Sequence, residues 1–195
     1  SAEPVPFFYS PHDIRNLHTT GSRLVDIMGL LPDYRIANVF PYAPHLAFWQ
    51  VFFAGQETGM MVLSTGGGKV MGSSGDLRAL TRLKADALIG VPGYVYHLLR
   101  RAATEHLDLS SIKCVVLGAE RVPPGMKQKI GQLLGECGAH DVRVFGTYGF
   151  TEARMAFAEC PTRDNAYTGY HLYPDMAIFE VIDPKTGEVV PDGED

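Results

Sequence analysis

Residues 85–117, ADALIGVPGYVYHLLRRAATEHLDLSSIKCVVL, have the pattern of a strand, a helix and a second strand. The apolar run from Ala85 to Val91 predicts a buried strand, and so does the run from Lys113 to Leu117. Between them Pro92 begins a helix whose apolar residues share one face, namely Val95, Leu98, Leu99 and Ala102. Because parallel neighbours need a crossover connection, a helix between two strands favours a parallel sheet.

The same alternation continues on both sides of this unit. Ser10, Pro11 and Asp13 predict the capped start of a first helix. Further strands are expected at 35–40, 60–64 and 142–145, and further helices over 45–55, from a cap at Ser74 and from Pro123. We therefore expect an α/β fold with a mostly parallel sheet flanked by helices, its strands buried on both faces.

The helix expected over 45–55 is apolar on nearly every side. Such a helix is typically buried, so Trp49, Phe52 and Phe53 are predicted to lie in the core. After Thr151 the pattern changes: runs at 179–182 and 188–190 flank the turn-forming stretch 183–187. This predicts that the chain ends in short antiparallel strands. We expect residues 1–150 to form the α/β core and residues 151–195 to begin a β-rich segment of the same domain. We also expect the chain to be a piece of a larger protein, so that this segment is truncated.

Composition excludes several classes of function. The chain has 195 residues, 46% hydrophobic and 20% charged, and 17 basic against 22 acidic side chains give a net charge of −5. Nucleic-acid binders normally carry a basic stripe, which this sequence lacks, and no apolar run approaches the roughly 20 residues of a membrane span. Three widely spaced cysteines form no disulfide framework. We expect a soluble cytoplasmic protein that binds neither nucleic acid nor membranes.

The unusual residues gather in the loops that follow the expected strands. In an open parallel sheet, ligands bind at the carboxyl ends of the strands, where these loops lie. The loops supply glycines, aromatic rings, hydroxyls and two acids, at 40–44, 65–68, 92–94, 118–120 and 146–152. Such loops are often rich in glycine and proline without any function, but their coincidence favours a pocket for a flat ring, phosphates and a metal.

Other familiar motifs are incomplete. Residues 66–72, GGGKVMG, match neither G-x-G-x-x-G nor a phosphate-binding Walker A loop, and 72–75 is one residue short of a hydrolase nucleophile elbow. Cys137, His140, Cys160 and His171 could hold zinc, but Cys137 continues the apolar face of its helix. A buried structural cysteine is the better interpretation.

The stretch Tyr148-Gly149-Phe150-Thr151-Glu152 carries the most chemistry. An aromatic ring can cover a purine, a glycine allows close approach, and a threonine hydroxyl can bind a phosphate. The carboxylate of Glu152 suits Mg²⁺, which prefers oxygen ligands. Thr151 could equally be the N-cap of a following helix, and the two roles are compatible.

These residues resemble a known family. The stretch 148–152 resembles the Y-G-x-[ST]-E motif of the adenylate-forming acyl-CoA synthetase superfamily, and Gly118-Ala119-Glu120 resembles its adenine-pocket loop. More narrowly, the chain is similar to phenylacetate–CoA ligases. Stretches with that likeness are Thr65-Gly66-Gly67, Val91-Pro92-Gly93-Tyr94, Glu159-Cys160, Gly169-Tyr170-His171 and Glu180 to Pro184.

The resemblance implies a two-step reaction. A carboxylate attacks the α-phosphate of ATP to give an acyl-adenylate, and the thiol of coenzyme A then takes the acyl group. Residues 1–150 would bind nucleotide and acid. Thr151 and Glu152 would be catalytic, Thr151 at the α-phosphate and Glu152 at Mg²⁺. The nucleotide (ATP or AMP) would contact Gly118, Ala119, Glu120, Thr147, Tyr148 and Gly149.

The acid, aryl or acyl, would lie among Phe40, Tyr42, Ala43, His45, Tyr94 and Gly146 by the same resemblance. Gly146 stands where many relatives carry Asn or Asp, which removes a polar contact and enlarges the expected pocket. Two alternatives stay open: an enzyme that passes the acyl group to a protein or another acceptor, and a nucleotide-binding module without catalysis. An oligomer is compatible with the sequence.

Overall fold

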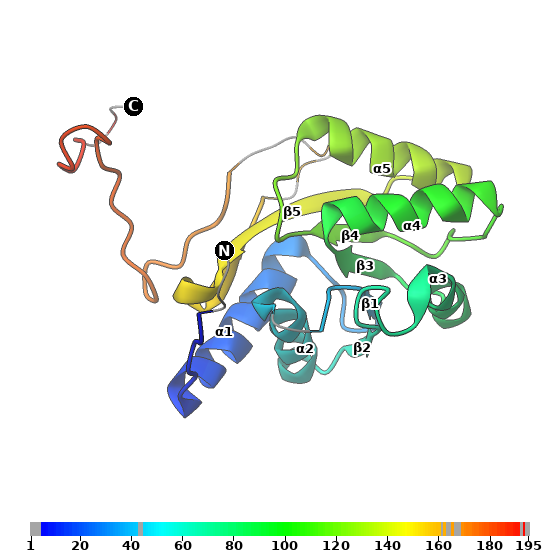
Figure 1. Cartoon of the computed structure of the whole chain (residues 1–195), viewed down its shortest axis with the longest axis horizontal. Helices are drawn as coiled ribbons and strands as arrows, with labels where there is room; N and C mark the ends of the chain where they lie inside the picture. Colours follow the sequence, from blue (N-terminus) through cyan, green and yellow to red (C-terminus); the bar gives the residue numbers. More distant parts are fainter. Residues whose placement is uncertain are drawn as a thin grey trace.

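A computed structural model describes residues 5–42, 45–160, 162, 165, 169–191 and 193 (Figure 1). The helices are α1 (Pro11–Met28), α2 (Leu46–Thr58), α3 (Gly72–Leu83), α4 (Pro92–Thr104), α5 (Pro124–Glu136) and the short 3₁₀ helix η1 (Thr151–Ala153). The strands are β1 (Arg35–Asn38), β2 (Met61–Ser64), β3 (Ala87–Gly90), β4 (Cys114–Leu117), β5 (Arg143–Phe150) and β6 (Met155–Ala158).

These strands form one sheet in the order β2-β1-β3-β4-β5-β6. The first five strands are parallel, and β6 pairs with β5 in the antiparallel sense. Helices α3, α4 and α5 cover one face of the sheet, and α1 and α2 cover the other (Figure 1). The predicted α/β fold, with a mostly parallel sheet, flanking helices and an antiparallel end, is therefore confirmed.

Local signals explain where α1 begins and ends. Ser10 accepts a hydrogen bond from the backbone N–H of Asp13, whose carboxylate accepts in turn from the Ser10 N–H. Pro11 occupies the first helical position, and Gly29 ends the helix in the left-handed conformation at φ 58°. The predicted capped start is confirmed.

Two predicted positions need correction. Helix α3 begins at Gly72 with Met71 as its N-cap, so Ser74 lies inside the helix. The reason is the turn before the helix, in which the Gly72 N–H donates to the Gly68 carbonyl. The helix therefore begins earlier in the chain than predicted. Strand β2 is not buried on both faces, because it lies at the edge of the sheet; Met61 is 56% exposed.

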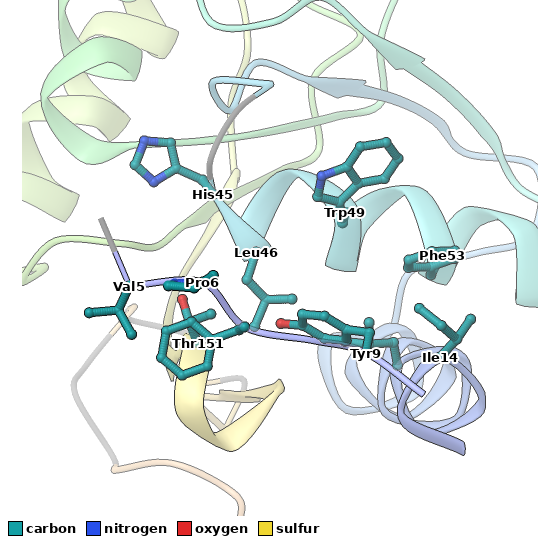
Figure 2. A pocket seen from close by; sticks show the side chains of 11 residues that line it. Val5, Pro6, Tyr9, Ile14, His45, Leu46, Trp49, Phe53 and Thr151 are labelled. Atoms are coloured by element: carbon teal, nitrogen blue, oxygen red, sulfur yellow. The ribbon is translucent and has the colours of Figure 1, made fainter. Parts of the chain in front are cut away.

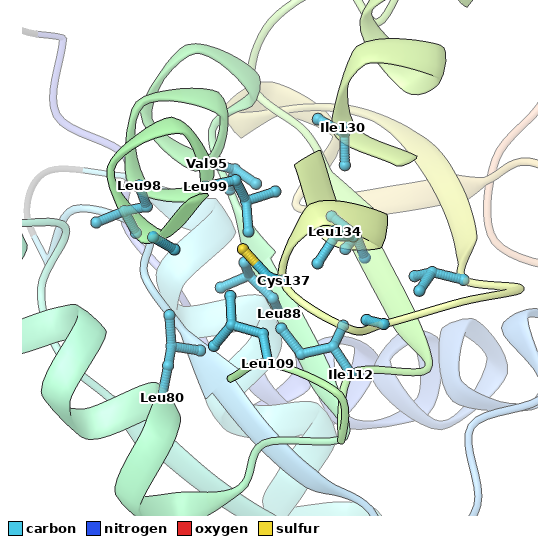
Figure 3. Close-up of a cluster of buried hydrophobic side chains, with 14 of the residues drawn as sticks. Leu80, Leu88, Val95, Leu98, Leu99, Leu109, Ile112, Ile130, Leu134 and Cys137 are labelled. Atoms are coloured by element: carbon cyan, nitrogen blue, oxygen red, sulfur yellow. The ribbon is translucent and has the colours of Figure 1, made fainter. Parts of the chain in front are cut away.

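The core lies mainly between the sheet and α3, α4 and α5 (Figure 3). Leucines of α4 and α5 pack there on Leu88 and Val115 from the strands, and Cys137 is buried among them, as predicted. Helix α2 departs from the prediction: Phe48, Gln50, Ala54 and Gly55 are buried, but Phe52 is 37% exposed and Trp49 and Phe53 are half-buried.

Strand β5 is longer than the sequence indicated. It continues to Phe150 because β6 turns back and pairs with it, from Thr147 opposite Ala158 to Phe150 opposite Met155. Residues 146–150 are thus strand rather than loop, and Thr151 is the first residue of η1 rather than its N-cap. Further on, the strands expected at 179–182 and 188–190 are reduced to one antiparallel bridge between Ile182 and Val189.

Within the described ranges, every helix is too short or too polar to cross a bilayer.

Candidate active site

The alternation of β5 sorts the predicted site residues onto two faces of the sheet. Val144 packs with the core under α4 and α5, whereas Phe145 packs with the core under α1 and α2. Successive strand residues point to opposite faces. Gly146 and Tyr148 therefore share the α5 face, and Thr147 and Gly149 share the α2 face.

On the α2 face a pocket of about 190 Å³ brings five predicted residues together. They are His45, Ala119, Thr147, Gly149 and Thr151. The Thr147 hydroxyl donates to the Leu117 carbonyl at 3.0 Å, which joins β5 to the end of β4. Gly118 adjoins the pocket, since a Cβ at this position would collide with Thr147 Oγ1. The adenine-loop residue Ala119 adopts φ 68°, a left-handed conformation that turns the chain sharply after β4.

A larger cavity of about 640 Å³ opens beside this pocket (Figure 2). Both are lined by His45, Leu46 and Thr151, so Thr151 lies where they meet. The far wall is aromatic, formed by Tyr9 from the segment before α1 and by Trp49 and Phe53 from α2. Trp49 and Phe53 were expected in the core; both are half-buried and line this cavity, and Trp49 also packs against the core under α1 and α2. The sequence signal for this cavity wall was a helix, apolar on nearly every side, that directly follows a predicted binding loop.

Phe40 and Tyr42 line neither of these two cavities. Phe40 is buried and borders a narrow cavity of about 60 Å³ that Thr147 also lines. The Tyr42 ring packs against Phe48 and Trp49 at 5.2 and 5.5 Å between centroids. The predicted residue Ala43 lies outside the described residues.

Tyr94 is placed apart from the other predicted acid-binding residues. Its hydroxyl donates to Asp76 Oδ2 at 2.6 Å and lies against Gly68. Burial and the Asp76 carboxylate both raise the pKa of Tyr94 above its ordinary value. This contact ties the start of α4 to α3 and to the glycine-rich loop.

On the α5 face, Tyr148 is 51% exposed and packs near the rings of Phe157 and Tyr170. Glu120 is exposed and accepts a hydrogen bond from the Gly93 N–H at 3.4 Å. Gly146 opens no extra space, contrary to expectation: a Cβ there would lie 2.9 Å from the carboxylate of Glu159. That carboxylate is buried and paired with Lys127.

Glu152 is exposed in η1, directly after Thr151. The described residues contain no group of three or more His, Cys, Asp or Glu side chains that could hold a metal by themselves. Among the residues considered for zinc, Cys160 and His171 are in contact, with 2.6 Å between Sγ and Nε2. An ion at Glu152 would therefore need ligands from a bound substrate.

Comparison with known proteins agrees with this fold. The chain belongs to the family of AMP-binding enzymes, whose model matches residues 11–195. It is 22% identical over 199 residues to a phenylacetate-coenzyme A ligase of Pseudomonas putida and 22% identical over 198 residues to one of Thermus thermophilus. These matches cover 100% and 99% of this chain but 42% of each relative.

Solved structures share the fold. A 2-hydroxyisobutyryl-CoA ligase in complex with 2-HIB-AMP and CoA matches with a TM-score of 0.85 and 22% identity, over 100% of this chain and 40% of that one. A long-chain-fatty-acid-CoA ligase from Archaeoglobus fulgidus matches with a TM-score of 0.73 and 22% identity, over 92% and 36%. The chain spans less than half the length of these relatives.

Proposed function

We propose that this protein activates a carboxylic acid with ATP and transfers the acyl group to coenzyme A. The observation that carries this proposal is the position of Thr151, at the junction between the smaller pocket on β5 and the large apolar cavity. A substrate with an apolar body and a carboxylate head would place its head at this junction. The α-phosphate of ATP would meet it there.

The residues of the junction suit a reaction that depends on positioning. Ala119 and Gly149 are small enough for a phosphate or ribose to approach the backbone closely, and the Thr151 hydroxyl can donate to a phosphate oxygen. His45 lies on the edge shared by both cavities and can donate to the carboxylate or to the phosphate. Adenylyl transfer gains most from such fixed donors.

Mg²⁺ fits the exposed carboxylate of Glu152. This ion is usually held by one or two carboxylates together with substrate phosphates, so a single acidic side chain beside a phosphate site is sufficient. When bound, the ion neutralises charge on the phosphate oxygens. Glu152 then contributes an anionic ligand and a fixed direction, while Thr151 holds the phosphate next to it.

The acid in this proposal is aryl or acyl, because the larger cavity is lined almost entirely by apolar and aromatic side chains. Coenzyme A is the proposed acceptor, and the cytoplasm the proposed compartment. Cys114 and Cys137 are buried thiols, which suits a reducing compartment.

The direct test is ATP–pyrophosphate exchange with phenylacetate, benzoate, hexanoate and a long-chain fatty acid, each with and without coenzyme A. Exchange that depends on one class of acid would support adenylate formation and identify the substrate. Thioester formation would then identify the acceptor. A folded, nucleotide-binding protein that catalyses no exchange with any acid would contradict the proposal and favour a module without catalysis.

A further inference from the structure

A buried ion pair lies behind the α5 face of the candidate site. Lys127 in α5 and Glu159, directly after β6, have side chains that are 3% and 1% exposed, and Lys127 Nζ lies 2.7 Å from Glu159 Oε2. Removing two charges from water is costly and needs compensation from good hydrogen bonds. Both oxygens of this buried carboxylate are therefore expected to accept hydrogen bonds.

The two oxygens of this carboxylate differ in their hydrogen bonds. Oε2 accepts from Lys127 Nζ and from the backbone N–H of Gly146. Oε1 is equally buried and accepts from no donor among the residues that the structure describes. Buried carboxylate oxygens nearly always have a partner, so an orphan acceptor suggests a donor that arrives with a ligand.

The strand register places this carboxylate next to Tyr148. Tyr148 faces Phe157 across the β5–β6 pair, and the next pair on the same face is Gly146 with Glu159, whose N–H donates to the Gly146 carbonyl. The carboxylate thus lies one pair from the Tyr148 ring, on the same face of β5. It reaches this position only because residue 146 is glycine, since a Cβ there would approach it to 2.9 Å.

We infer that Glu159 determines the base specificity of the nucleotide site, with Oε1 accepting a hydrogen bond from the exocyclic amino group of adenine. This inference rests on the proposed function, in which the protein binds ATP, and on the nucleotide contact with Tyr148 that the family resemblance implies. The ring of Tyr148 is half exposed, so it can turn aside and pack against an incoming base with little loss of buried surface. Guanine and hypoxanthine carry an acceptor oxygen where adenine carries this amino group, and would face the carboxylate with like partial charge.

The roles of Lys127 and Gly146 follow from the same geometry. Both donate to Oε2, which fixes the carboxylate and leaves Oε1 to the ligand.

The first test compares the binding of three nucleotides to the unmodified protein. Calorimetry on the full chain would measure AMP, purine riboside 5′-monophosphate, which lacks the amino group, and inosine 5′-monophosphate. We expect AMP to bind at least about tenfold more tightly than the purine nucleotide, as for a hydrogen bond to a charged group. Inosine monophosphate should bind weakest of the three.

The double variant Lys127→Met with Glu159→Gln removes both buried charges and keeps their approximate shape. In this variant the preference for AMP should fall to within about twofold, whereas Glu136→Gln, at the exposed end of α5, should leave the preference unchanged. Equal binding of the three nucleotides to the unmodified protein, or a preference that persists in a folded double variant, would overturn the inference alone. Absence of binding by any nucleotide would overturn the proposed function as well.

Discussion

Glu152 offers an exposed carboxylate directly after the Thr151 hydroxyl, at the end of β5. Because a metal held mainly by phosphates loses its protein anchor without this group, Glu152→Gln should lower Mg²⁺-dependent ATP–pyrophosphate exchange by roughly a hundredfold or more. Folding should be unaffected. The exposed Glu136 at the end of α5 provides the control, since Glu136→Gln should retain full exchange. An unimpaired Glu152→Gln protein would refute the metal assignment.

Asp86 predicts how stability depends on pH. Burial raises the pKa of this carboxyl, but hydrogen bonds from Arg35 and Lys113 outweigh burial and lower it from 3.8 to about 2. The lowered pKa means that the charged form is stabilised in the folded state. This stabilisation is complete above about pH 4 and is lost as the pH falls through about 2.

The expected loss of free energy of unfolding between these pH values is about 2 kcal/mol, and Asp86→Asn should abolish this part of the acid dependence. Urea denaturation at pH 5, 4, 3 and 2 measures it. Asp26→Asn, on the exposed side of α1, is the control and should keep the acid dependence of the unmodified protein. Parallel curves for the Asp86→Asn and unmodified proteins would contradict the assignment.

At the level of elements, α1 and α2 are in such close contact that one glycine is required. A Cβ at Gly21 would lie 2.7 Å from the Cα of Ala54 in α2, and backbone cannot yield as a flexible side chain can. Gly21→Ala should therefore lower the free energy of unfolding by about 1–3 kcal/mol.

Gly131 in α5 is the matched control, because nothing lies within 4 Å of a Cβ there. Gly131→Ala should raise the free energy of unfolding by about 0.5–1 kcal/mol, as alanine favours a helix over glycine. Chemical denaturation of both variants measures the difference. Effects of the same sign would show that helix propensity, rather than the contact between α1 and α2, decides the result.

The elements also show what the sequence could and could not predict. Capping by Ser10 and the strands around Pro92 depend on local signals, and both were predicted correctly. The extension of β5 to Phe150 depends on pairing with β6, a non-local contact that no period in residues 146–150 reveals. Tertiary contacts commonly override local propensity in this way.

The same reasoning separates the residues of the site. Ala119 and Thr151 lie in stretches predicted to follow strands, so the rule that ligands bind at strand ends predicted them together, whereas His45 was predicted from the family resemblance. The carboxylate of Glu159 could not be foreseen, because its position depends on register across β5 and β6. Trp49 and Phe53 were misplaced because an apolar helix face looks the same whether it packs against protein or against a ligand cavity.

For the whole molecule, the sheet separates two tasks. In our proposal the base lies on the α5 face of β5, and the apolar body of the acid lies in the larger cavity on the other side of the sheet. The two cavities on that side meet where His45, Leu46 and Thr151 line both of them. Occupancy of the acid side can therefore be measured independently of the nucleotide.

The single tryptophan of the chain, Trp49, lines the larger cavity and reports directly on that side. An acid with an apolar tail that enters the cavity should exclude water from the indole and shift its emission to the blue, whereas acetate should not. Titration with hexanoate or phenylacetate gives the affinity.

Phe53→Ala should raise the Kd of the acid that binds by roughly tenfold, because a large apolar contact is lost. Phe8→Ala removes a ring that is 83% exposed and should leave the Kd unchanged. If every acid left the emission unaltered, or if both variants bound with the same affinity, the apolar tail would have to lie elsewhere. The narrow cavity beside Phe40 would then be the place to examine, and its small volume would limit the acid to a short or flat tail.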